Sequence, residues 1–297
     1  MASNNNKKLV FFDMDGTLLN SKKVFNPSTI QAIKTLKEQD FIFCIATGRA
    51  LSEGILDFAK MLDLEDYLVL ANGSYVWDIQ SEKLTTLGLP LPRTVVQLFY
   101  EKALEHKRQL NFYFEDGSIK YYYFGDDQNE DIKDPNFFRV GPIIYNFADP
   151  AKIQFDLEKP IIHAGIKAEG SVIRQIYPEV SSLEAMNLTQ ISNVLDVYID
   201  ADPAGISKWN GIQYVQRKLG ISNENTFAFG DSGNDILMLQ NVGHGIVMGN
   251  AEESIKAMFK HVIGDNNSDA IAECLYSIAD GSFFKETVNA DDTVDKH

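Results

Sequence analysis

The stretch that decides the fold of this chain lies near its N-terminus and reads Leu9-Val10-Phe11-Phe12-Asp13-Met14-Asp15-Gly16-Thr17-Leu18-Leu19. A short apolar run that ends in a turn signal is typical of a strand buried on both faces of a parallel sheet. Ligands of open α/β sheets bind beyond the carboxyl ends of such strands. We therefore expect the two carboxylates after this run, Asp13 and Asp15, to lie at the mouth of a sheet.

The spacing of Asp13 and Asp15 brings two like charges close together. Such a pair is costly when partly buried, unless a cation or a proton intervenes. Mg²⁺ fits this need because it takes oxygen ligands and keeps waters that a phosphate can replace. An aspartate can also act as the nucleophile in phosphoryl transfer. Taken alone, however, an Asp-x-Asp-Gly sequence is equally typical of a turn, so the other motifs must decide.

The composition is that of an ordinary globular chain. With 297 residues, 44% of them hydrophobic and 23% charged, it is long enough for two domains. The net charge of -15 argues against a nucleic acid or an anionic membrane as a partner. Any phosphate site must therefore make its own positive field from a metal, a lysine and backbone N–H groups.

The cysteines and the N-terminus indicate a cellular location. Cys44 and Cys274 are the only cysteines, so no disulfide framework is expected. The first eight residues are polar, and no run approaches the roughly 18 apolar residues of a membrane span. We expect a cytoplasmic protein without a signal peptide.

The order of the predicted elements indicates two domains. Strands at 9–12, 41–46 and 67–70 alternate with helical segments, which predicts a doubly wound parallel sheet. Between them and a second parallel-sheet pattern after 200 lies a mixed block of strands and helices, in which 125–150 is predicted as loop plus helix. We therefore predict a discontinuous core at 1–84 and 201–297, and an inserted domain at 85–200.

Two further motifs could bind phosphate. Thr47-Gly48-Arg49 follows the predicted strand at 41–46, where a hydroxyl and backbone N–H groups can hold phosphate oxygens. Taken alone it also fits a helix N-cap with a glycine turn. Lys208 begins a predicted helix. A lone lysine there is commonly a surface charge, but its unfavourable position against the helix dipole favours a fixed anion nearby.

The last motif, Gly230-Asp231-Ser232-Gly233-Asn234-Asp235, follows a predicted strand at 226–229. Asp231 is placed to be a third oxygen ligand of Mg²⁺. Asn234 and Asp235 reach toward the same place from the start of the next helix. Without the other motifs, the run would also fit a polar loop that caps a helix.

Taken together, these motifs resemble the signatures of the haloacid dehalogenase (HAD) superfamily of phosphatases. Asp-Met-Asp-Gly-Thr at 13–17, Thr47, Lys208 and Asp231 follow the order of the family's four signatures. The Asn72-Gly73 pair and the segment 248–251 resemble the Cof-type subfamily IIB and are pocket-lining candidates. One departure is that Trp209 follows Lys208 where this branch usually has glycine, which concerns the shape of the loop.

The resemblance implies an α/β fold, with a HAD-like Rossmannoid parallel-sheet core and an inserted α+β cap of the C2B type. It further implies a Mg²⁺-dependent phosphatase that hydrolyses small phosphomonoesters through an aspartyl-phosphate. The implied roles are the nucleophile Asp13, the acid/base Asp15, the metal ligands Asp13, Asp15 (main-chain carbonyl) and Asp231, the phosphate-binding residues Thr47, Gly48, Arg49, Lys208 and Asn234, and Asp235 behind the ligands.

Alternatives to a phosphatase remain at this point. A phosphomutase would use the same aspartyl-phosphate but transfer the phosphoryl group to a second hydroxyl. A non-catalytic phospho-acceptor would also combine Asp, Thr, Lys and Mg²⁺, although such modules have no cap, and a degenerate binding protein would lack some motif residues. The core motifs set the reaction class, whereas the cap sets the substrate. Sugar phosphates are the substrates that the resemblance favours, followed by nucleotide, flavin and pyridoxal phosphates, and the oligomeric state is left open.

Overall fold

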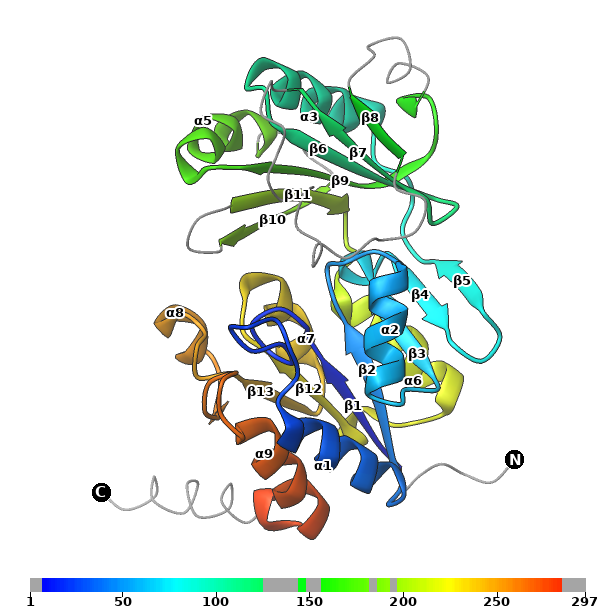
Figure 1. Ribbon diagram of the computed structural model, residues 1–297, viewed down its shortest axis with the longest axis vertical. Coiled ribbons are helices and arrows are strands. Elements are labelled where there is room, and N and C mark those ends of the chain that lie inside the picture. The colour runs from blue at the N-terminus through cyan, green and yellow to red at the C-terminus, as the bar shows by residue number, and fades with distance from the viewer. Residues whose placement is uncertain (1–6, 125–143, 148–155, 182–185, 193–196, 285–297) are drawn as a thin grey trace. The chain divides into compact units, whose positions relative to one another are not determined.

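The computed structural model describes residues 7–124, 144–147, 156–181, 186–192 and 197–284 (Figure 1). The chain divides into two compact units. Unit 1 comprises Met1–Ile45, Lys60–Asp66 and Val215–His297, and unit 2 comprises Ala46–Ala59 and Tyr67–Tyr214. These limits differ from the predicted domain boundaries at 84/85 and 200/201, which stay a prediction.

Unit 1 is built on parallel strands. In the order β14-β13-β12-β1-β2, these are His261–Val262, His244–Val247, Thr226–Gly230, Lys8–Phe12 and Phe41–Ala46. The residues of β1 from Leu9 to Phe12 are at most 1% exposed, and each such phenylalanine contributes about 1.5–3 kcal/mol through burial. Helices α1 (Pro27–Lys37) and α9 (Ala270–Asp280) pack side by side in this unit (Figure 1). The shorter helices are α7 (Ile236–Asn241) and α8 (Glu253–Lys256).

Unit 2 contains an antiparallel ribbon and a separate sheet. The ribbon consists of β3 (Tyr67–Leu70), β4 (Tyr75–Asp78) and β5 (Lys83–Thr86). The sheet has the order β10-β11-β9-β6-β7-β8, with strands Met186–Ser192, Val197–Pro203, Ile161–Ala168, Gln109–Phe114, Ile119–Tyr123 and Ile144–Phe147. Helices α3 (Arg93–Glu105) and α5 (Gly170–Val180) cover one face of this sheet and bury an apolar core with it (Figure 1). Two more helices, α2 (Glu53–Met61) and α6 (Lys208–Leu219), include the points where the chain passes from one unit to the other.

The structure confirms the predicted α/β class and the strands that precede each motif. The prediction of loop plus helix at 125–150 is wrong at Ile144–Phe147, which is strand β8 paired with β7; the rest of that segment lies outside the described residues. Three further strands were not predicted, namely β4, β5 and β10. They are short or weakly alternating, and their strand character depends on pairing with neighbours.

Candidate functional site

The first motif begins where β1 ends. The backbone N–H of Asp13 donates to the carbonyl of Phe229 at 2.9 Å, so β1 and β12 run in register up to the motif. The side chain of Asp13 is buried, with the residue 5% exposed. The loop that carries Asp231 follows β12 directly. Adjacent parallel strands therefore bring the first and last motifs to one edge of the sheet, as the sequence predicted.

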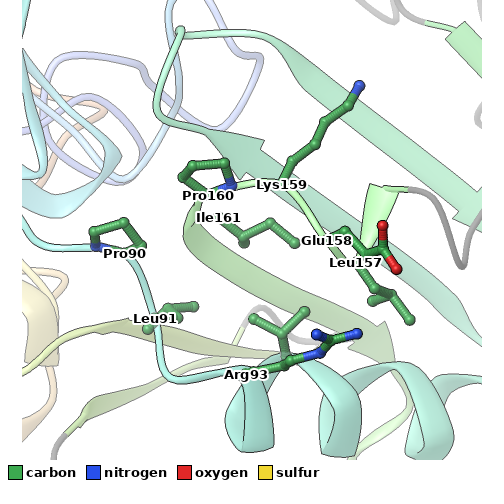
Figure 2. Close-up of a pocket in the computed structure, with 9 residues that line it drawn as sticks. Pro90, Leu91, Arg93, Leu157, Glu158, Lys159, Pro160 and Ile161 are labelled. Carbon is green, nitrogen blue, oxygen red and sulfur yellow. The ribbon is translucent and has the colours of Figure 1, made fainter.

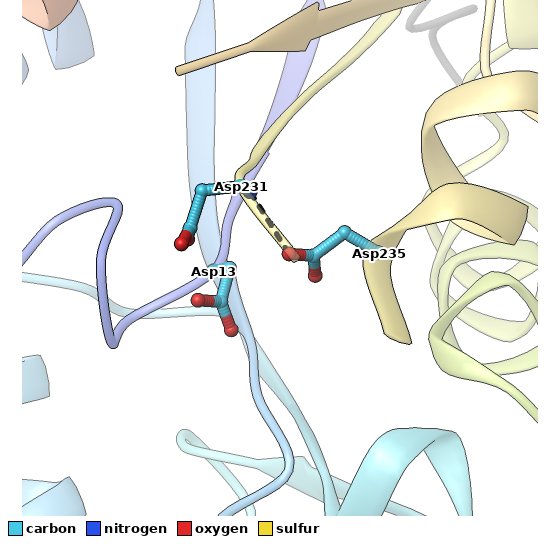
Figure 3. A group of neighbouring side chains, drawn as sticks. All are labelled: Asp13, Asp231 and Asp235. Carbon is cyan, nitrogen blue, oxygen red and sulfur yellow. Dashed lines mark hydrogen bonds between the residues drawn. The ribbon is translucent and has the colours of Figure 1, made fainter. Parts of the chain in front are cut away.

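Three carboxylates meet at this edge (Figure 3). One carboxylate oxygen each from Asp13, Asp231 and Asp235 lies within 4.8 Å of the other two. The Oδ2 atom of Asp235 accepts hydrogen bonds from the backbone N–H groups of Asp231 and Ser232, each at 3.0 Å. Asp235 therefore shapes the loop that presents Asp231, and its expected position behind the metal ligands stays a prediction. The carboxylate of Asp15 does not belong to this cluster, and the metal ligand predicted at that residue is its main-chain carbonyl.

The loop after Asp15 wraps closely around Asp231. The hydroxyl of Thr17 donates to Oδ1 of Asp231 at 2.7 Å. Gly16 has a φ of +88°, and a Cβ at that position would lie 2.3 Å from Oδ2 of Asp231. The amide of Asn250 donates to the carbonyl of Gly16 at 2.9 Å, which places this pocket-lining candidate at the same site. Thr17 is part of the first motif, but no local pattern in the sequence marks it as a partner of Asp231.

Asp15 and Asn234 have partners of their own within unit 1. Oδ1 of Asp15 lies 3.2 Å from Nζ of Lys23, and both side chains are at least one-third exposed. Lys23 was not among the predicted site residues, and no motif in the sequence marks it. Oδ1 of Asn234 accepts a hydrogen bond from the hydroxyl of Ser232 at 2.6 Å. Both residues thus lie in ordered polar loops, where a substrate would have to compete with these contacts.

Thr47, Gly48 and Arg49 lie in unit 2, directly after β2. Thr47 is 1% exposed, and its Oγ1 accepts a hydrogen bond from the backbone N–H of Arg49 at 3.1 Å. The guanidinium of Arg49 lies over the ring of Phe58, 5.9 Å from the ring centroid. The hydroxyl therefore organises a turn at the end of the strand, and the phosphate-binding role expected for Thr47 stays a prediction.

Lys208 is fully buried at the first position of α6, with 0% of the residue exposed. The surface-charge interpretation of this lysine is thereby excluded. Oδ1 of Asn210 accepts hydrogen bonds from the backbone N–H and the hydroxyl of Ser207, at 2.8 and 3.0 Å. Asn210 thus shapes the turn before Lys208, where the departure from Ser-Lys-Gly had put the loop geometry in question.

The predicted site residues thus fall into two groups, one in each unit. Unit 1 holds Asp13, Asp15, Asp231, Asn234 and Asp235, and unit 2 holds Thr47, Gly48, Arg49 and Lys208. The combination of the two groups into one active site stays a prediction.

A separate cavity of about 210 Å³ lies in unit 2, between residues 90–96 and residues 157–161 (Figure 2). Arg93 and Glu158 line it, and the side chain of Lys159 points away from it in this view. None of the predicted site residues lines this cavity. It is therefore not the candidate active site.

Comparisons with known proteins confirm the family resemblance that the sequence indicated. The family model for haloacid dehalogenase-like hydrolases matches residues 10–275. The chain is 27% identical to the 5-amino-6-(5-phospho-D-ribitylamino)uracil phosphatase YcsE of Bacillus subtilis (strain 168), over 90% of this chain and 94% of the relative. It is 28% identical to the pyridoxal phosphate phosphatase YbhA of Escherichia coli (strain K12), over 91% of this chain and 98% of the relative.

Among solved structures, the chain resembles the HAD subclass IIB sugar phosphatase BT4131. The TM-score is 0.75 with 24% sequence identity, and the match covers 92% of this chain and 99% of that one. This likeness shows the fold, and it confirms the predicted α/β class with a parallel-sheet core.

Proposed function

Because the chain belongs to the haloacid dehalogenase-like hydrolases, we propose that it is a phosphoric monoester hydrolase that depends on Mg²⁺ and forms an aspartyl-phosphate at Asp13. Its named relatives include phosphatases for small phosphorylated metabolites, among them pyridoxal phosphate. The proposed substrates are small phosphomonoesters of this kind, with sugar phosphates as the first class to examine. Which ester it hydrolyses depends on the cap.

The observation that carries the proposal is the meeting of Asp13, Asp231 and Asp235 at the end of parallel strands. Carboxylates at such short separations repel one another, and their partial burial raises the cost. The donor set consists of oxygen atoms only, which suits a hard divalent cation better than a soft metal. These residues therefore fit Mg²⁺. Asp13, Asp231 and the main-chain carbonyl of Asp15 would hold it, and Asp235 would shape the loop.

When bound, Mg²⁺ would offset negative charge on the phosphate oxygens. In the first step, a carboxylate oxygen of Asp13 attacks phosphorus and the bond to the ester oxygen breaks. Asp15 gives its proton to that leaving oxygen. In the second step, the ionised Asp15 takes a proton from water, whose oxygen attacks phosphorus and releases Asp13 and inorganic phosphate.

The proposed phosphate-binding residues of unit 2 would support this chemistry. Lys208 supplies a positive charge on a fully buried side chain, where electrostatic interactions are stronger than in water. The Thr47 hydroxyl and the N–H groups near Gly48 can donate to phosphate oxygens. Arg49 and Asn234 are proposed to contact the phosphate or the ester group. These roles rest on the motif match, together with the burial of Thr47 and Lys208.

The replacement Asp13→Asn tests the nucleophile. It keeps the size of the side chain but removes the attacking carboxylate, so turnover of an aryl phosphate with Mg²⁺ should fall by at least about 10³-fold. Circular dichroism should show an unchanged fold. A variant that retains the wild-type rate would refute the assignment. Transfer of phosphate to a sugar hydroxyl in place of water would indicate a mutase.

The proposed partner is thus a small phosphorylated metabolite, and a cytoplasmic location is part of the proposal. Among the residues that the structure describes, no helix combines the length and apolar character needed to cross a membrane.

A further inference from the structure

The turn at Ala71–Gly73, directly after β3, has an unusual backbone. Its three residues have φ values of +46°, +49° and +94° in succession. The left-handed region is unfavourable for a residue with a Cβ atom, and Ala71 has no polar side chain to compensate locally. Such a conformation persists only where the surroundings impose it. Contacts with neighbouring residues must therefore stabilise this turn.

The turn contacts the backbone beside both phosphate-binding candidates of unit 2. The N–H of Asn72 donates to the carbonyl of Thr47 at 3.1 Å, and the N–H of Ala71 donates to the carbonyl of Arg49 at 2.9 Å. On its other side, a Cβ on Gly73 would lie 1.9 Å from the carbonyl oxygen of Ser207 and 3.0 Å from the backbone nitrogen of Lys208. One three-residue turn thus sets the spacing between Thr47 and Lys208.

The side chain of Asn72 is held from behind by a buried ion pair. Its Nδ2 donates to Oδ2 of Asp202 at 2.9 Å. Oδ1 of Asp202 lies 2.8 Å from Nδ1 of His163, which belongs to the neighbouring strand β9. Asn72, Asp202 and His163 are 3%, 1% and 1% exposed. The contacts therefore run without interruption from the sheet β10-β11-β9-β6-β7-β8 of unit 2 (the cap sheet) to the turn.

Two further contacts hold His163 itself. Its Nε2 lies 3.5 Å from Oδ1 of Asp200, and its ring stacks on Tyr113 with centroids 4.3 Å apart. Burial opposes the charged form of the imidazole, but attraction to Asp202 and Asp200 prevails and raises the pKa of His163 to about 10. A charged His163 donates from Nδ1 to Asp202, which leaves the other oxygen of Asp202 to accept from Asn72.

We propose that Asn72, Asp202 and His163 are positioning residues, through which the cap sheet holds the Ala71–Gly73 turn and so fixes Thr47 and Lys208 at the spacing that a phosphate group requires. This inference rests on the proposed function, because it takes Thr47 and Lys208 to bind phosphate. All five residues belong to unit 2.

The cap sheet also offers a matched control. Asp156 is 1% exposed and binds Lys120 at 2.6 Å and the hydroxyl of Tyr122 at 2.9 Å, with Lys159 at 3.2 Å. Asp156 is as deeply buried as Asp202 and also has a cationic partner, but none of these contacts involves the Ala71–Gly73 turn. The variant Asp156→Asn should lower the thermal midpoint without changing phosphate affinity. If the contact between His163 and Asp202 served stability alone, variants at Asn72 or Asp202 and the variant at Asp156 would have the same effect on phosphate affinity.

The test exchanges the two polar groups of the Asn72–Asp202 pair. Asn72→Asp keeps the side-chain size and tolerates the left-handed backbone, but it sets a second carboxylate against Asp202. The dissociation constant for inorganic phosphate with Mg²⁺, measured by calorimetry, should rise by about tenfold or more. In the double variant Asn72→Asp/Asp202→Asn, the new amide at position 202 can donate to the new carboxylate at position 72 while its oxygen accepts from His163. Affinity should return to within about threefold of wild type.

The affinity for inorganic phosphate tests this inference separately from the turnover of an ester, which tests the proposed function. If neither the wild type nor Asp13→Asn turns over an ester, the hydrolase proposal fails, while phosphate affinity still reports on positioning. Wild-type affinity in Asn72→Asp, equal weakening in Asp156→Asn, or no rescue in the double variant would each overturn the inference. An absence of phosphate binding by the wild-type protein would also overturn it.

Discussion

Two acidic clusters in this molecule differ in how their charge is balanced. In unit 1, Asp13, Asp231 and Asp235 meet at strand ends, and every member of the cluster is a carboxylate. In unit 2, Asp200 and Asp202 lie on one strand with His163 between them on the next. The second cluster includes a histidine that can carry a positive charge, whereas the three grouped residues of the first are all carboxylates.

This difference suggests different roles for the two clusters, with the first as a metal-binding site and the second as a structural ion pair. A buried carboxylate that already has a hydrogen-bonded cation is locked in one geometry, which suits it to hold other groups in position. Carboxylates that cluster at the ends of parallel strands offer only oxygen ligands, which suits them to bind an exchangeable divalent cation that a substrate can share. We therefore expect the first cluster to respond to metal and the second to respond to pH.

Metal removal should have the largest effect. A chelator should reduce the turnover of an aryl phosphate by at least about 10³-fold, and excess Mg²⁺ should restore it, because the proposed reaction needs the metal charge on the phosphate. Mg²⁺ should also raise the thermal midpoint of the protein, since binding to the folded state stabilises it. Full activity and an unchanged midpoint in chelator would contradict the assignment of the first cluster as a metal site.

His163→Gln should have the next largest effect, and it should act on stability. Breaking a buried ion pair costs about 3–5 kcal/mol, because it leaves an uncompensated carboxylate. The pKa of His163 is raised from 6.5 to about 10, so its stabilising effect is complete below pH 6.5 and disappears as the pH rises through 10.

Urea titrations between about pH 6 and about pH 10.5 would measure this dependence, since they span the window between the unfolded and folded pKa of the histidine. The unfolding midpoint of the wild type should fall as the pH rises, and that of His163→Gln should fall less steeply. Parallel pH profiles for the two proteins would show that the histidine does not titrate as described.

Thr17→Val should have the smallest effect, confined to the first cluster. Valine keeps the shape of threonine but removes the hydrogen bond to Oδ1 of Asp231, so the carboxylate is less well oriented. Mg²⁺ affinity should fall by about tenfold, as is usual when the partner of a metal ligand is lost. A titration of activity against Mg²⁺ measures it, with the thermal midpoint in chelator as the control for folding. An unchanged affinity would show that Thr17 does not orient Asp231.

The motifs at strand ends were predictable because each follows a buried apolar run. The run before Asp13 and the run before Asp231 carry strong local signals, and parallel pairing of β1 with β12 then brings the two residues together. The pairing of His163 with Asp202 had no such signal. Both lie within strands of the cap sheet, and their contact depends on the register of β9 against β11, which local sequence does not set.

The burial of Lys208 likewise depends on tertiary packing and could not be predicted from the local sequence. Its position at a helix start was apparent from the sequence, and a solvated charge was the ordinary expectation there. Packing around the first turn of α6 decided otherwise, with the residue 0% exposed. Strands β4 and β5 were also missed, because a short ribbon acquires its strand character from its partners more than from its own residues.

By itself, the sequence determined the order of the strands and helices of the core, the family, and the carboxylates from which the site is built. These follow from local patterns, since apolar runs and turn residues act over a few positions. The tertiary structure alone decided that Thr17 contacts the Asp231 carboxylate, and that His163 contacts Asp202 on the side away from Asn72. Those contacts join residues far apart along the chain, and only the packing of strands against one another sets which of them meet.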